Sequence, residues 1–86
     1  MTSLVSQIAT VGIAIAKVGE KIDRAEDQVA AALKKMESAT TTAQKKQFRE
    51  LHDHWWAEKS QLRAEKAQLQ EEKNALIHQQ GIAYYL

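Results

Sequence analysis

The sequence predicts an all-α fold, an antiparallel two-helix hairpin (a short coiled coil) that dimerises into a four-helix bundle. From Leu4 to Met36 an apolar residue recurs at alternating intervals of four and three, the heptad pattern of a helix packed lengthwise on another helix. From Phe48 onward a large apolar residue recurs every seven positions. The 86 residues include no proline and only three glycines, fewer turn residues than a compact β or α/β domain needs.

The first helix is expected over about residues 3–38, with Thr2 or Ser3 as its N-cap. In its first third, apolar residues also lie outside the heptad seam, because Val5 lies beside the seam and Ile13 opposite it. A helix that is apolar nearly all round is usually buried on more than one side. We therefore predict a self-association surface, called here the apolar flank, which consists of Val5, Ile8, Ile13 and Ile15.

A turn is expected over residues 38–42, where three consecutive threonines favour a helix cap over a helix interior. Thr41 followed by Gln44 resembles a capping box that opens a second helix. The length of this segment is typical of loops that join antiparallel helices.

The second helix is expected over about residues 42–81, with Gly81 as its C-cap and an apolar tail over residues 82–86. The whole chain, residues 1–86, is interpreted as a single helical-hairpin domain. The seam of the second helix is narrow, because lysines and a histidine occupy most of its other heptad column. Its large apolar members are Phe48, Trp55, Leu62, Leu69 and Leu76.

Folding the chain about the turn places large residues of the second helix opposite small residues of the first, as a single packing layer requires. The hairpin-packing residues predicted in this way are Ala25, Ala32, Phe48, Trp55, Leu62, Leu69 and Leu76. In the same register Leu69 meets Gly12 and Leu62 meets Gly19. The two glycines either permit close approach of a helix or are simply tolerated at about 1 kcal/mol each.

A second candidate surface lies at the hairpin tip, where basic residues from both helices converge. It is either a solvated turn or a patch for an acidic protein, a phosphate or a membrane surface. Trp56 follows the seam residue Trp55 and is a candidate partner contact, although core packing is the more common role of such a tryptophan. This partner patch consists of Lys34, Lys35, Lys45, Lys46, Arg49 and Trp56.

No catalytic site, cofactor or metal site is expected from the sequence. His52 and His54 lie two positions apart, so a helix points them in nearly opposite directions, although Glu50 and His54 share a face. No nucleophile with a base and no glycine-rich phosphate loop is present. The net charge of +1 gives no argument for sequence-specific nucleic-acid binding, and the absence of cysteine favours a reducing intracellular compartment.

Two functions remain open at this point. The first is a non-enzymatic, self-associating coiled-coil module, most simply a homodimer, that scaffolds an unknown protein partner. The second is a membrane-active helical protein that inserts or docks through the apolar first third of its first helix. The polar residues Ser6, Gln7 and Thr10 favour protein contact, whereas Ile13 favours lipid or a second interface.

The segment WAEKSQLRAEKAQLQEEKNAL, residues 56–76, repeats the unit Leu-x-x-Glu-Lys-x-x. It resembles the coiled-coil segments of oomycete proteins associated with Crinkler-type secreted effectors, which carry iterated leucine, arginine, glutamate and lysine heptads. The resemblance covers about a quarter of the chain. It implies a pathogen effector that is delivered to a host cell, although the chain begins without a translocation motif of that family.

Overall fold

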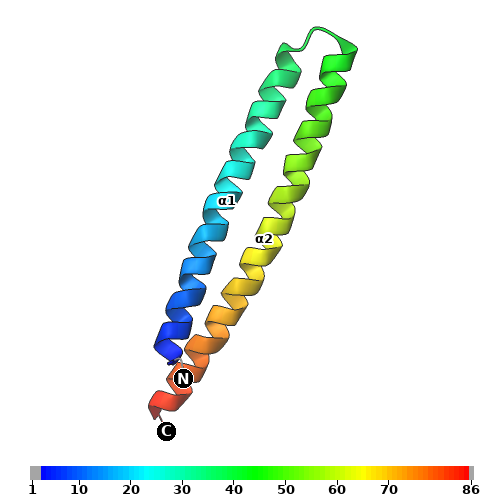
Figure 1. The fold of residues 1–86 in the computed structure, drawn as a ribbon. Coiled ribbons are helices and arrows are strands. Elements are labelled where there is room, and N and C mark those ends of the chain that lie inside the picture. The colour runs from blue at the N-terminus through cyan, green and yellow to red at the C-terminus, as the bar shows by residue number, and fades with distance from the viewer. Residues whose placement is uncertain (1–2, 86) are drawn as a thin grey trace.

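The computed structural model describes the backbone of residues 3–85 and the side chains of residues 3–82. Within that range the chain forms helices α1 (Leu4–Ser38) and α2 (Thr42–Tyr85). The two helices pack antiparallel along their length as an extended hairpin (Figure 1). The hairpin measures 67 × 18 × 14 Å. The predicted all-α antiparallel hairpin is therefore confirmed, whereas dimerisation stays a prediction.

Helix α1 begins where the sequence places its N-cap. The Ser3 hydroxyl accepts a hydrogen bond from the backbone N–H of Ser6 at 3.1 Å, which satisfies one of the free donors of the first turn. At the other end the backbone becomes extended at Ala39 (φ −70°, ψ 135°), and the N–H of Ala39 donates to the carbonyl of Met36. Helix α1 therefore ends in the predicted turn.

The turn itself uses the predicted threonine and glutamine. The backbone N–H of Gln44 donates to the Thr41 hydroxyl at 3.1 Å. In return, the Gln44 side-chain oxygen accepts from the backbone N–H of Thr40 at 3.3 Å. This reciprocal pair is a capping box shifted by one residue, because the glutamine reaches Thr40 rather than the N-cap residue Thr41.

Helix α2 does not end at Gly81, as the sequence led us to expect, but continues to Tyr85. A glycine C-cap adopts positive φ, and no glycine among residues 3–85 does so. Because no proline follows Gly81, nothing in the covalent chain stops the helix there. Residues 82–85 of the expected tail are therefore helical, and residue 86 lies outside the described range.

The core lies along the seam of α1, and most of its buried side chains come from that helix. Of the residues whose side chains are described, only Leu62 contributes a buried apolar side chain from α2. The lysine column of α2 explains the imbalance, because long charged side chains occupy the positions beside its leucines. The buried residues of the core are Val11, Val18, Ile22, Ala25, Val29, Ala32 and Leu62.

The two glycines of α1 do not serve as packing sites for the leucines of α2. A Cβ added at Gly19 would meet nothing within 4 Å, and one added at Gly12 would meet the Nζ atom of Lys73 at 3.9 Å. Leu62 instead packs in the cluster that includes Val18. The predicted glycine–leucine contacts are wrong because both glycines lie beside the seam, where they leave the surface of α1 open.

Candidate functional site

The predicted apolar flank of α1 is only partly covered by α2. Val5 is 62% exposed and Ile13 is 58% exposed, whereas Ile8 and Ile15 are half-buried. The difference follows from heptad position, because Ile8 and Ile15 belong to the seam and the other two side chains do not. The hairpin therefore leaves an apolar surface on the first third of α1.

The hairpin-packing residues lie between the helices at several depths. Ala25 and Ala32 are each 1% exposed, and Leu62 is buried in the same cluster as Ala25. Trp55 and Leu69 pack against that cluster as half-buried side chains. The remaining two predicted members, also half-buried, are Phe48 and Leu76.

The two adjacent tryptophans have different surroundings. Trp55 is half-buried, and the ring of His54 meets it edge-on at 5.4 Å between centroids. Trp56 is 52% exposed, stacks on His52 at 6.2 Å and has the Nζ atom of Lys59 5.0 Å from its ring centroid. Trp56 therefore presents a large exposed ring that packs against a histidine and a lysine, and exposed tryptophans are enriched at protein interfaces.

Beside Trp56 lies a cross-hairpin ion-pair cluster that the sequence reasoning missed. Glu26 of α1 accepts from Arg63 at 3.3 Å and from Lys59 at 3.5 Å, both from α2. The signal was present in the sequence as charges at positions that flank the seam. The sequence alone does not tell which flank of α1 lies on the same side of the hairpin as which flank of α2, so this ion pairing could not be predicted from it.

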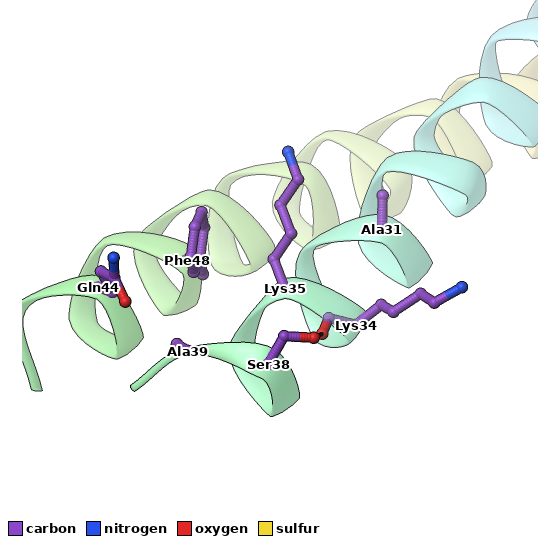
Figure 2. A pocket seen from close by; sticks show the side chains of 7 residues that line it. All are labelled: Ala31, Lys34, Lys35, Ser38, Ala39, Gln44 and Phe48. Atoms are coloured by element: carbon purple, nitrogen blue, oxygen red, sulfur yellow. Dashed lines mark hydrogen bonds between the residues drawn. The ribbon is translucent and has the colours of Figure 1, made fainter. Parts of the chain in front are cut away.

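The basic residues of the tip do not form one pocket. Lys34 and Lys35 line a depression with Ser38, Gln44 and Phe48. In Figure 2, Lys35 extends toward α2 beside the Phe48 ring, whereas Lys34 extends away from it. The Lys35 Nζ atom is 5.9 Å from the centroid of that ring.

The other three bases of the tip border a second depression, next to Met36 and Thr42. The two bases of α1 thus border one depression, and the three bases of α2 border the other. Within residues 3–82, no carboxylate forms an ion pair with any base of the tip. The bases in this second group are Lys45, Lys46 and Arg49.

The histidines near the tryptophans form no metal site in the described part of the chain. The Nδ1 atom of His52 lies 3.1 Å from an Asp53 carboxylate oxygen, while His54 faces the neighbouring tryptophan. No group of three or more histidine, cysteine, aspartate or glutamate side chains among the described residues is placed to hold an ion. In the same range, neither helix contains an apolar stretch long enough to cross a membrane.

We compared the chain with known proteins by sequence and by structure. No protein-family model, no curated protein and no solved structure matches it.

Proposed function

We propose that this chain is a non-enzymatic helical-hairpin module that self-associates through the apolar flank of α1 and scaffolds other proteins. The observation that carries the proposal is the exposure of Val5 and Ile13 on the first third of α1. Removing apolar surface from water stabilises by about 25 cal/mol per Å². Burying Val5 and Ile13 needs a surface outside the hairpin, because α2 packs on the seam of α1 and these two side chains lie beside the seam and opposite it.

The facing part of α2 supports the proposal. Its apolar residues Leu69 and Leu76 are half-buried in the seam, and between them Lys73 extends its ammonium group over Gly12. A lysine covers apolar surface with its methylene groups but keeps its charge in water. The other large apolar side chains described at this end of α2, Ile77 and Ile82, are 45% and 47% exposed, so they do not cover the flank within the hairpin. A second hairpin is the simplest source of a cover.

The direct test is sedimentation equilibrium of the wild-type chain and an Ile13→Glu variant at neutral pH. We expect a dimer at micromolar concentration for the wild type and weaker association for Ile13→Glu, with unchanged helical content by circular dichroism. Gln28→Glu is the matched control, because it adds the same charge to an exposed position of α1 outside the flank. A wild-type chain that stays monomeric at high micromolar concentration would contradict the proposal.

The same exposed side chains favour a second candidate function, docking on a lipid surface with α1 in the plane of the membrane. Flotation with vesicles of neutral and of anionic lipid separates the two functions. Binding that Ile13→Glu abolishes, from a chain that sediments as a monomer, would favour the membrane function. The pathogen-effector role stays a prediction that only the resemblance of residues 56–76 implies.

A further inference from the structure

Four of the large apolar side chains that the hairpin leaves exposed lie on one of its faces. They belong to two columns, each built from residues seven positions apart, one on either helix. We call the surface that these columns form the Glu26 face. Its α1 column is Val5, Gly12, Gly19, Glu26 and Leu33, and its α2 column is Trp56, Arg63, Gln70 and Ile77.

Contacts between the helices show that the two columns share a face. Arg63 reaches Glu26 at 3.3 Å, which joins the columns directly. Lys59 binds the same carboxylate at 3.5 Å and lies over the ring of Trp56. Nearer the open end of the hairpin, the nearest atom to a Cβ built at Gly12 is the Nζ atom of Lys73, at 3.9 Å.

The columns have matching patterns of polarity. Each has a large apolar residue at either end, and these four side chains are 44% to 62% exposed. Between the apolar ends, the α1 column carries the carboxylate of Glu26, whereas the α2 column carries the guanidinium of Arg63. The α1 column is therefore complementary to the α2 column in charge at its middle and in apolar character at the end where Leu33 and Trp56 lie.

We infer that the Glu26 face binds the Glu26 face of a second copy of this chain, with the two turns at the same end of the resulting four-helix bundle. This inference rests on the proposed self-association and adds its surface and orientation. A two-fold axis parallel to the helices sets the α1 column of one copy against the α2 column of the other at an unchanged height. Leu33 then meets Trp56 of the partner subunit, and Glu26 meets the partner's Arg63.

Charge selects this orientation over its alternative. A two-fold axis perpendicular to the helices also stacks the two faces, but it places α1 on α1 and α2 on α2. The basic middle of α2, where Lys59, Arg63 and Lys66 lie, would then face its own copy. Like charges directly opposed at an interface destabilise it, whereas the parallel axis places Arg63 opposite the partner's Glu26.

The face is also large enough for a stable dimer. The whole hairpin measures 67 × 18 × 14 Å, so its long side has a projected area of roughly 1,200 Å², against the roughly 800 Å² of accessible surface that each partner contributes to an interface of standard size. Val5 lies within the Glu26 face. Ile13 lies at the edge of this face, separated from the α1 column by the exposed alanines Ala9 and Ala16. The apolar flank is therefore part of the same interface.

The first test compares two leucine truncations. Leu33→Ala removes an apolar side chain from the Glu26 face, whereas Leu51→Ala removes one of similar exposure, 38% against 44%, from another part of α2. Sedimentation equilibrium should show a dimer dissociation constant raised about tenfold or more by Leu33→Ala and changed by less than about twofold by Leu51→Ala. Equal effects of the two truncations would overturn the assignment of the face.

The second test uses the absence of cysteine from the chain. Ala16→Cys and Ala67→Cys place single thiols beside the α1 and α2 columns, and both alanines are exposed. In the inferred dimer, a mixture of the two variants forms a crosslinked heterodimer with a short bis-maleimide, more readily than either variant alone. The control mixture is Ala31→Cys with Ala57→Cys, which lie at exposed positions outside the two columns and should not crosslink.

The outcomes separate this inference from the proposed function. A dimer that crosslinks in the control mixture, or in which Ala16→Cys reacts only with its own copy, overturns the inferred face and orientation but leaves self-association intact. A chain that is monomeric at high micromolar concentration overturns both. Vesicle binding that protects Trp56 from a soluble quencher, with no dimer in solution, assigns the face to lipid and also overturns the inference.

Discussion

The tightest point of the hairpin is predicted to resist any increase in side-chain volume. Ala25 and Ala32 are each 1% exposed, and Ala25 lies in the cluster with Val18, Ile22 and Leu62, against which Trp55 packs. Ala25→Leu adds three carbon atoms at a position that its neighbours already cover almost completely. The helices must separate or Trp55 must leave its position, at a cost of about 1–3 kcal/mol.

Thermal and urea unfolding, followed by circular dichroism at one fixed protein concentration, measure this loss. For a domain of this size, a loss of about 2 kcal/mol lowers the Tm by roughly 8–16 °C. The matched control is Ala64→Leu, at an exposed position on α2, where leucine and alanine have similar helix propensities. If Ala25→Leu and Ala64→Leu changed the free energy of unfolding equally, the close packing around Ala25 would be refuted.

Two further predictions concern the ends of α2. Thr41→Ala removes the hydroxyl that accepts from the Gln44 N–H, so it should lower the free energy of unfolding by about 1 kcal/mol. Thr41→Ser keeps a hydroxyl and should retain the wild-type stability. An unchanged urea midpoint for the alanine variant would exclude a capping role. Gly81→Ala should raise helical content and stability by up to about 1 kcal/mol, because Gly81 lies within the helix and not at its end. Destabilisation by this substitution, measured in the same urea titration, would instead indicate a glycine C-cap with positive φ.

Heptad periodicity and cap chemistry were enough to predict the fold. The seam of α1 contains all six of the buried residues that this helix contributes, because regular spacing of apolar residues specifies which side of a helix is covered. The turn was equally predictable, since Thr41 supplies the cap that its position in the sequence suggests. The end of α2 was not predictable from Gly81, because a glycine permits positive φ but does not impose it.

The candidate surfaces were less predictable, because they depend on which flanks of the two helices lie on the same side. Four bases occur as the adjacent pairs Lys34–Lys35 and Lys45–Lys46, which suggested one patch, yet the hairpin divides them between two depressions. Conversely, Glu26 and Arg63 are far apart in sequence and meet at 3.3 Å. A heptad position gives the angle of a side chain about its own helix, but only the packed hairpin relates the angles of two helices.

The unequal contributions of the two helices suggest a division of roles within the proposed bundle. Helix α1 is covered along its seam by α2 and carries further exposed apolar residues, so it has the wider apolar surface of the two. Among the residues whose side chains are described, helix α2 buries a single leucine, and lysines flank its seam, so its outer surface is predominantly charged. A second hairpin on the Glu26 face would cover α1 from two sides and leave much of the charged surface of α2 in water. In such an assembly α1 contributes most of the core, whereas the exposed side of α2 and the two basic depressions at the tip remain free for other partners.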